Sequence, residues 1–379
     1  MPNPTVPKLT RVSPLERSVL KSPLRIVSIG GGTGLSTLLS GLKKHARGAQ
    51  ERPGAGSPVV EITAVVTVTD DGGSSGRLRR DFDILPPGDI RNCMTALSED
   101  EDLLSQLFQY RFAGGRGLKG HSFGNLFLTA LHQITGDFAH AVKLSSEILA
   151  IRGRIFPATS SNVTLEAVLA DGCVVRGESK ISKSRRPIEE VRLRPGDCDP
   201  LPEVLEAIAV ADLITVGPGS LYTSIIPNLL VKGIPKAIQE SPALKAYFVN
   251  LMWQPGETIN FAASQHVDAI HKHAGQNIID CVVLNSAAIP LALQRRYARA
   301  HVKPVENDLE RLAELRVKVV TAELIGGGEP ASQTVRHDSA ALAEVVIDLA
   351  SRSRAHRVRK EALAAQRTRL AKRSQHNDR

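Results

Sequence analysis

The sequence predicts an α/β fold with a mainly parallel β-sheet, helices on both faces of the sheet and a small antiparallel β insertion. Short β-branched runs alternate with stretches of helical periodicity over some 300 residues, a pattern typical of parallel sheets. The run VVEITAVVTV (59–68) is almost continuously β-branched, as in a strand covered on both faces. Glycine-rich turns follow three of the predicted strands. We therefore also expect a ligand to bind at the edge of the sheet where these turns lie.

The first predicted unit is a strand, a tight turn and a helix. RIVSI (25–29) is the strand and glycines follow it. The leucines at positions 35, 38, 39 and 42 have the spacing of a helix with one buried face. A second strand is predicted at 59–68, and residues 88–150 are expected to be mostly helical.

The pattern changes at residues 151–195, where we expect the antiparallel insertion. Two β-branched runs flank Asp171-Gly172, a pair that suits a tight hairpin turn. Predicted strands and helices then alternate again up to residue 350. The predicted strands are 212–216, 247–252, 281–285 and 317–322, and the predicted helices lie near 202–211, 221–230, 261–273, 288–299 and 339–350.

These patterns divide the chain into a proline-interrupted, flexible lead-in (1–23), a single α/β domain (24–350) and a basic C-terminal tail (351–379). The tail holds ten of the lysines and arginines against two acidic residues, so most of the formal charge of +9 lies there. We expect a solvated, partly helical extension that could contact anionic polymers or a membrane surface. This basic tail is the only feature of the sequence that indicates nucleic-acid binding.

Composition limits the class of protein further. No apolar run approaches the roughly 18 residues that a transmembrane helix needs, and the first residues lack the apolar stretch of a signal peptide. The four cysteines form no C-x-x-C pair, which excludes the usual zinc and disulfide patterns. We therefore expect a soluble cytoplasmic protein with reduced thiols, and we expect it to be a homo-oligomer.

Glycine-rich turns at strand ends predict a phosphate-bearing ligand. Gly31, Gly32, Thr33 and Gly34 follow the first strand, and a second turn at 217–220, with Gly217, Gly219 and Ser220, follows the strand at 212–216. Ligands of parallel sheets bind at the carboxyl ends of the strands, where backbone N–H groups at helix N-termini favour anions. The turns fit neither of the standard nucleotide-binding glycine patterns in full.

The stretch TDDGGSSGR (69–77) places Asp70 and Asp71 at the end of the second strand. These carboxylates could cap a turn, hold a ribose hydroxyl, hold Mg²⁺ beside a phosphate, or orient or deprotonate an acceptor hydroxyl in phosphoryl transfer. Residue spacing does not separate these alternatives.

Other polar residues near these turns complete the set of candidates. Gly72, Gly73, Ser74 and Ser75 follow the two aspartates, and Arg77, Asn92, His121, Asn125 and Trp253 lie in nearby motifs. Residues 72–76 also fit G-x-S-x-G, the nucleophile motif of many hydrolases. No histidine stands out as its partner in the sequence, so we disfavour a hydrolase.

Six motifs together resemble the YvcK-type gluconeogenesis factors, the bacterial branch of the CofD-like family. They are IGGGTGLSTLLSGLK, VTVTDDGGSSGRLRRDF, LPPGDIRNC, KGHSFGNLFLTAL, GPGSLYTSIIPNLLV and QPGET, in that order within residues 24–325. The resemblance implies a Rossmann-like core with an added subdomain. Two positions depart from the usual pattern: Trp253 replaces a threonine and Gln265 an acidic residue.

The resemblance implies one of two activities. YvcK-type proteins are associated with binding nucleotide sugars such as UDP-N-acetylglucosamine and with cell-wall formation and cell shape under gluconeogenic growth. CofD itself is a 2-phospho-L-lactate transferase that uses Mg²⁺ and a deazaflavin acceptor. The residues at 31–34 and 217–220 would then contact the diphosphate, Asp71 would face the acceptor, and 69–77 would be the ligand-facing loop. Whether the chain is an enzyme stays open.

Overall fold

The computed structural model describes residues 22–46, 60–98, 103–326 and 334–377, with the side chains of the last helix described through residue 364. Its centre is a seven-stranded sheet in the order β10-β9-β8-β7-β1-β2-β3, and all six pairings are parallel. The strands are β1 (Leu24–Gly30), β2 (Val60–Val66), β3 (Arg154–Pro157), β7 (Leu213–Val216), β8 (Leu244–Phe248), β9 (Cys281–Asn285) and β10 (Lys318–Ala322). The predicted parallel sheet is confirmed.

The strand order reverses between β1 and β7. From β1 the chain builds outward through β2 and β3, and it then returns to place β7 on the other side of β1, with Ile29 opposite Val216. Ligands of open parallel sheets bind at such a reversal, outside the carboxyl ends of the strands. The turns after β1 and β7 are the two glycine-rich turns, so the topology brings both to this point.

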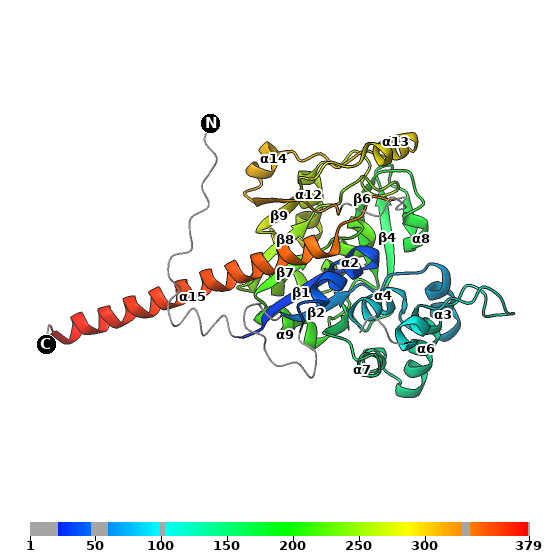
Figure 1. The fold of residues 1–379 in the computed structure, drawn as a ribbon, viewed down its shortest axis with the longest axis horizontal. Helices are drawn as coiled ribbons and strands as arrows, with labels where there is room; N and C mark the ends of the chain where they lie inside the picture. Colours follow the sequence, from blue (N-terminus) through cyan, green and yellow to red (C-terminus); the bar gives the residue numbers. More distant parts are fainter. Residues whose placement is uncertain (1–21, 47–59, 99–102, 327–333, 378–379) are drawn as a thin grey trace.

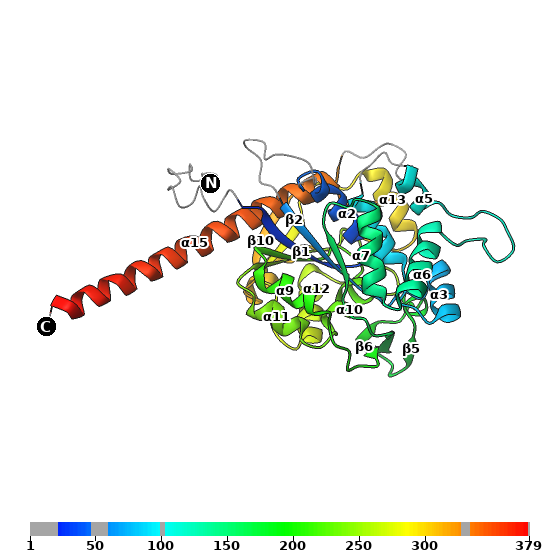
Figure 2. The same cartoon turned by 90° about the horizontal axis from the view of Figure 1, so that it is seen from below.

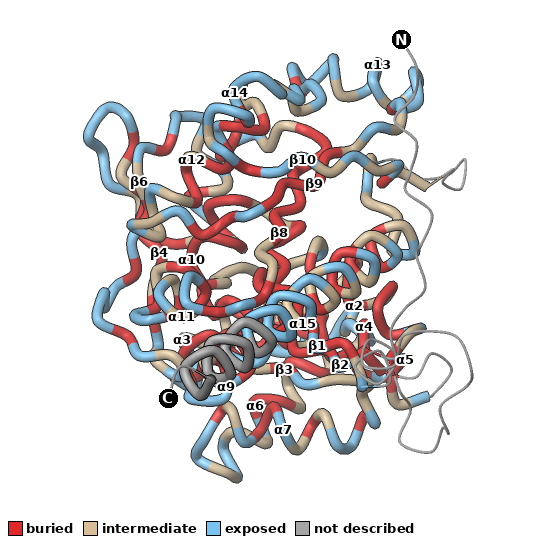
Figure 3. The backbone as a smooth tube through the Cα atoms, turned by 90° about the vertical axis from the view of Figure 1, so that its left-hand side faces the viewer, coloured by how far each residue is buried: buried red, intermediate tan, exposed pale blue. Residues whose placement is uncertain are grey.

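Helices cover both faces of the sheet (Figures 1 and 2). On one face lie α2 (Gly32–Lys43), α4 (Gly88–Leu97) and α15 (Ser339–Asn377); on the other lie α9 (Pro202–Val210), α11 (Ile234–Glu240) and α12 (Ala263–Ala274). Strand side chains such as Ile29 and Val65 are fully buried between these layers, and Figure 3 shows the buried residues concentrated along the strands. This two-sided burial explains the continuously β-branched strand sequences.

The remaining helices connect these elements. They are α3 (Gly73–Phe82), α5 (Leu103–Gln109), α6 (Phe123–Thr135), α7 (Phe138–Ile148), α8 (Glu178–Ile181), α10 (Ile226–Leu229), α13 (Leu291–Arg299) and α14 (Leu309–Glu314), with a π-helix at Leu221–Ile225. The stretch expected as one helix at 221–230 is therefore this π-helix followed by α10. The part of the chain that the structure describes contains no helix both long and apolar enough to cross a membrane.

The predicted insertion is a separate antiparallel sheet. Its order is β5-β4-β6, with β4 at Thr164–Leu169, β5 at Val174–Arg176 and β6 at Ile188–Arg194. Gly172 in the β4–β5 turn has φ +81°, which suits the expected tight turn. Glu166, buried on β4, pairs with Arg176 and Arg194 on the two flanking strands.

The C-terminal helix α15 begins on the body and continues well beyond it (Figure 1). The predicted boundary at residue 350 therefore falls inside one continuous helix. Arg354 and Arg357, which belong to the predicted basic tail, form ion pairs with Asp212 just before β7. Part of the basic charge at this end thus fixes the helix to the sheet. The lead-in, at residues 1–21, lies outside the described residues.

One strand boundary was wrong. The sequence predicts a strand at 247–252, but β8 runs from Leu244 to Phe248. Residues 250–255 leave the sheet and form one wall of a cavity beside the glycine turns. Apolar residues continue past the end of the strand because Leu251 and Met252 pack in a small core of their own with Ile289 and Val302.

Candidate functional site

The glycine turns after β1 and β7 lie against each other. A Cβ atom built on Gly34 would be 2.4 Å from the carbonyl oxygen of Pro218 and 2.8 Å from the Cα atom of Gly219. Gly32 has φ +61°, a conformation that favours glycine. The backbone can take this path only without side chains at these positions, so the two turns form one continuous main-chain surface.

This surface borders a cavity of about 440 Å³, which we call the glycine-turn cavity. Its volume is within the range of small-molecule sites in proteins. It is lined by Gly31, Gly32, Thr33, Gly34, Thr37, Pro218, Gly219, Ser220, Ser224, residues 250–255, Tyr297 and residues 334–337. The structure thus brings together six predicted site residues: Gly31, Gly32, Thr33, Gly34, Gly219 and Ser220.

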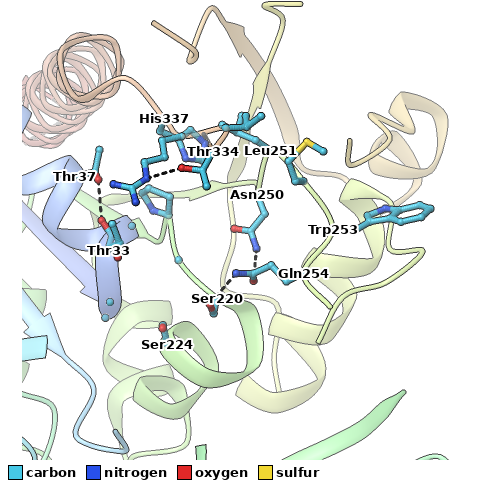
Figure 4. Close-up of a pocket in the computed structure, with 18 of the residues that line it drawn as sticks. Thr33, Thr37, Ser220, Ser224, Asn250, Leu251, Trp253, Gln254, Thr334 and His337 are labelled. Atoms are coloured by element: carbon cyan, nitrogen blue, oxygen red, sulfur yellow. Dashed lines mark hydrogen bonds between the residues drawn. The ribbon is translucent and has the colours of Figure 1, made fainter. Parts of the chain in front are cut away.

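A chain of side-chain hydrogen bonds holds the second glycine turn in place (Figure 4). Asn250 Nδ2 donates to Gln254 Oε1 at 3.0 Å, and Gln254 Nε2 donates to Ser220 Oγ at 2.9 Å. Glu257, buried behind the turn, accepts from the backbone N–H of Tyr222 and from the Thr223 hydroxyl. Burial raises the pKa of this carboxyl. The turn at Ser220 is therefore fixed from both sides before any ligand binds.

The wall opposite the glycines is the segment that leads into α15. Arg336, an exposed residue on this wall, donates through Nε to the Thr334 hydroxyl at 3.2 Å, and the Val335 N–H donates to the Tyr297 hydroxyl at 3.2 Å. His337 lines the same wall; burial lowers its pKa to about 4, so it is neutral, and its Nε2 atom is buried without a partner among the described residues. The wall thus offers one cation and one neutral imidazole.

Trp253 lies at the edge of the cavity, with its ring pointing away from Ser220 (Figure 4). Its Nε1 donates to the Phe261 carbonyl at 3.0 Å, and the Lys303 ammonium lies 5.8 Å from the ring centroid. Both contacts are internal to the protein, so Trp253 packs against its own chain at the cavity edge.

The two predicted aspartates do not line the glycine-turn cavity. Asp70 Oδ1 accepts from the Gly72 N–H at 2.8 Å, within its own turn. Asp71 Oδ1 accepts from the Ser179 N–H at 2.8 Å, which ties the turn after β2 to α8 of the insertion. Both aspartates therefore lie beside the glycine-turn cavity, and Asp70 makes the turn-capping contact that the sequence allowed.

Two further carboxylates complete an acidic cluster of Asp70, Asp71, Asp89 and Glu178. Burial and the nearby Asp70 charge raise the pKa of Asp89 to about 6. Burial, followed by the charges of Asp70 and Asp71, raises the pKa of Glu178 to about 7. Asp89 also connects the cluster to the cavity, because a Cβ atom on Gly31 would lie 2.8 Å from its Oδ2 atom. The cluster and the cavity thus share the first glycine turn as a wall.

A second hydrogen-bonded chain links four polar residues beside the acidic cluster. Arg91 Nε donates to Asn125 Oδ1 at 2.9 Å, and Asn125 Nδ2 donates to Ser74 Oγ at 3.1 Å. Ser74 Oγ also hydrogen-bonds His121 Nδ1 at 3.0 Å, and either atom can be the donor, because a hydroxyl has one proton and two acceptor lone pairs. Burial lowers the pKa of His121, which favours the neutral ring.

These hydrogen bonds show that His121 is the histidine beside Ser74, the serine of the G-x-S-x-G pattern. However, Ser74 is only 4% exposed, and no carboxylate hydrogen-bonds His121 in the part of the chain that the structure describes. A hydrolase nucleophile needs an exposed hydroxyl and an oriented base. Ser74 therefore acts as an internal link, and the arrangement does not favour a hydrolase.

The other predicted residues lie outside the glycine-turn cavity. Arg77 donates to the Lys119 carbonyl, Ser75 lies against Gly88, and Gly73 has open space around it. Asn92 lines a separate cavity, and Gly217 supports the second turn at φ +76°. Asp89 lies in the motif LPPGDIRNC, which the sequence had already singled out. The sequence did not identify Asn250, Gln254, Tyr297, Arg336 and Glu178 as site residues, and only QPGET, which contains Gln254, gave a signal for these five.

Most of the chain is similar to known proteins. Residues 26–325 match the family model described as 2-phospho-L-lactate transferase CofD. A gluconeogenesis factor of Bacillus subtilis (strain 168) is 46% identical over 325 residues, covering 86% of this chain and 98% of the relative. The gluconeogenesis factor of Halalkalibacterium halodurans is 45% identical over 323 residues, covering 85% of this chain and 95% of that protein. A crystal structure of a Bacillus halodurans protein superposes with a TM-score of 0.79 at 45% identity, covering 86% of this chain and 100% of the other.

Proposed function

Because the chain belongs to the 2-phospho-L-lactate transferase CofD family, we propose that its glycine-turn cavity binds a nucleotide sugar of the UDP-N-acetylglucosamine type. We further propose that the protein acts as a gluconeogenesis factor, as its relatives are named. The observation that carries the proposal is the contact between the two glycine turns at the reversal of strand order. A diphosphate is the group that such a surface suits best.

The glycine turns favour an anionic group in the ligand. The turn after β1 opens directly into α2, which begins at Gly32, so its N–H groups and the helix dipole favour negative charge. The turn after β7 reaches the same cavity through Gly219 and Ser220. Two adjacent anion-binding turns match the two linked phosphates of a nucleoside diphosphate.

The remaining walls suit the polar ends of such a ligand. Arg336 offers a guanidinium opposite the glycine turns, and Asn250 and Gln254 offer amide groups beside Ser220. Sugars and bases are recognised by such amide and hydroxyl groups, while arginine pairs well with phosphate. In this proposal the diphosphate lies between the glycine turns and Arg336. A role in cell-wall formation and cell shape under gluconeogenic growth is part of the same proposal.

The test is a calorimetric titration of the full chain with UDP-N-acetylglucosamine. Saturable binding that UDP competes for, and that free N-acetylglucosamine does not, supports the proposal. A flat titration at millimolar ligand contradicts it. The Gly34→Ala variant separates binding at the glycine turns from binding elsewhere, because the added methyl group collides with the Pro218 carbonyl.

The acidic cluster favours a second candidate, a phospholactyl transfer from a nucleoside diphosphate donor to the hydroxyl of a deazaflavin acceptor. Glu178, with a pKa of about 7, can accept a proton from a hydroxyl near neutral pH. Asp71 would face the acceptor in this candidate. The cluster borders the same glycine turn as the cavity, which is the arrangement that a donor and an acceptor require.

We propose Mg²⁺ as the metal of this second candidate, held by Asp70 and Asp71. Within the described residues no three His, Cys, Asp or Glu side chains are placed to hold a metal together. The carboxylates do fit an ion such as Mg²⁺ that takes one or two carboxylates and completes its shell with phosphate oxygens and water. When bound, it would neutralise phosphate charge.

A turnover assay with a deazaflavin acceptor and Mg²⁺ distinguishes the two candidates. If the chain is a transferase, the wild type forms product and Asp71→Asn abolishes it while nucleotide binding stays largely intact. If the wild type binds the nucleotide sugar and forms no product, the binding function stands alone.

A further inference from the structure

A second cavity lies between α2 and α4, beside the glycine-turn cavity. Its volume is about 350 Å³, and Thr37 lines both cavities. We call it the hydroxyl-lined cavity. Its lining residues are Ser36, Thr37, Ser40, Arg91, Asn92, Thr95, Ala96 and Gln109. Seven of these eight side chains are polar, which is unusual for a gap between packed helices.

Arg91 brings a positive charge to this cavity without a matching anion. Its Nε and Nη2 atoms donate to the neutral amide oxygens of Asn125 and Asn92, at 2.9 and 2.6 Å. It makes no ion pair within the described residues, although Asp89 and Asp70 act on it from a greater distance. Burial and the nearby Arg111 charge lower the pKa of Arg91. A half-buried guanidinium in this position has capacity for an anion.

The hydroxyls of α2 are hydrogen-bond acceptors toward the cavity, whereas Arg91 is a donor. Ser36 Oγ donates to the Gly32 and Thr33 carbonyls, and Thr37 Oγ1 donates to the Thr33 carbonyl at 2.8 Å. Since their protons point into the helix, these oxygens can only accept hydrogen bonds from a ligand. Thr95 Oγ1, on α4, is buried without a partner among the described residues. Such an unsatisfied hydroxyl is costly unless a ligand or water completes it.

We propose that the hydroxyl-lined cavity binds a small anionic polyhydroxy compound, a sugar phosphate or a sugar acid. The anionic group pairs with the guanidinium of Arg91, and the hydroxyls of the ligand donate to Ser36, Thr37 and Thr95. Inorganic phosphate would satisfy only the first contact, and an uncharged sugar only the second. The cavity volume admits a ligand that makes both. The site shares Thr37 with the glycine-turn cavity but holds its anion at Arg91, which does not line that cavity, so it does not depend on the proposed function.

Calorimetric titration of the full chain tests the anion contact and the hydroxyl contacts separately. The four probes are glucose 6-phosphate, gluconate, inorganic phosphate and glucose. We expect the phosphorylated sugar, the sugar acid or both to bind about tenfold more tightly than inorganic phosphate and glucose, because each makes both sets of contacts. The comparison of the first two probes identifies phosphate or carboxylate as the preferred anion. If neither binds more tightly than inorganic phosphate, the proposal is wrong.

Variants locate the binding. Arg91→Gln should weaken it about tenfold or more, whereas Lys236→Gln, which removes the charge of an exposed side chain on α11, should not change it. Because Arg91 also supports Asn125, a second variant is needed. Ser40→Asp places a carboxylate at the half-exposed cavity wall, where it should repel the anion with little effect on folding. Unchanged affinity in Ser40→Asp would overturn the assignment of the site.

The two sites can be separated in the same experiment. Ser40→Asp should keep its affinity for UDP-N-acetylglucosamine within about threefold, because position 40 lies one turn of α2 beyond the glycine-turn cavity. Gly34→Ala should lose nucleotide-sugar binding and keep binding of the anionic sugar. If both ligands respond to Gly34→Ala alone, they share the glycine-turn cavity and the second site does not exist.

Discussion

Gly34, in the first turn of α2, and Pro218, just after β7, approach so closely that a Cβ atom on Gly34 would lie 2.4 Å from the Pro218 carbonyl oxygen. A distance below 3.0 Å cannot persist between a real Cβ atom and a backbone oxygen, so one of the turns would have to move. These two residues are 184 positions apart in the chain. Their contact joins both glycine turns into one surface.

Gly34→Ala should therefore abolish detectable binding of UDP-N-acetylglucosamine while the protein stays folded. The methyl group displaces the second turn from the first, so the two turns can no longer contact one diphosphate. Calorimetry measures the binding and circular dichroism the fold. Gly114→Ala is the matched control, since a Cβ atom there meets open space. Retained affinity in Gly34→Ala would show that the ligand does not contact both turns.

Arg336→Gln should weaken binding of the nucleotide sugar by about 10- to 100-fold, the range expected when a charged hydrogen bond of about 1.5–3 kcal/mol is lost. The loss should shrink at high salt, because the contact is partly electrostatic. Arg295→Gln, an exposed arginine on α13, serves as the control. Equal affinity for Arg336→Gln and the wild type would place the phosphates away from the wall of 334–337.

Glu178→Gln should stabilise the protein at pH 8 and have progressively less effect as the pH falls to 5. The folded protein raises the pKa of Glu178 from 4.5 to about 7, so the folded state holds the proton more tightly than the unfolded state. The resulting stability is fully present below pH 4.5 and is lost as the pH rises through about 7. The glutamine side chain does not ionise, so the variant does not lose this stability as the pH rises. Melting temperatures at the two pH values measure the effect; an equal difference at both would contradict it.

Asp212→Asn should destabilise the fold by about 3–5 kcal/mol, the usual cost of removing one partner of a buried ion pair. Asp212 is 1% exposed and is the shared partner of Arg354 and Arg357 on α15. Asp348→Asn is the control on the same helix, because its pair with Arg352 is exposed and should contribute about 0.3–0.5 kcal/mol. Urea unfolding measures both. Similar losses in the two variants would mean that the buried pair does not anchor α15.

The fold could be predicted from the sequence because its signals are local. A buried parallel strand and a glycine turn each have a pattern within ten residues, and the alternation of strands and helices then sets the class. The strand end at Phe248 was misplaced because Leu251 and Met252 are apolar for another reason, the small core beside the cavity.

The site could be predicted only in part. The glycine turns carry their own signal, whereas no local pattern shows that Tyr297 on α13 and Arg336 on the segment before α15 meet at the cavity. The link between Ser74 and His121 spans 47 residues and depends on how α3 and α6 pack. Asp70 binds its own turn, which was one of the alternatives for the adjacent aspartates, whereas the contact of Asp71 with the insertion could not be predicted from residue types.

A crystal structure of the full chain with UDP-N-acetylglucosamine tests the central claim most directly. The account predicts the diphosphate between the backbone N–H groups of 31–34 and 219–220, with the Arg336 guanidinium on its opposite side. Density for the diphosphate against Asp70 and Asp71, with the glycine turns left free, would contradict it.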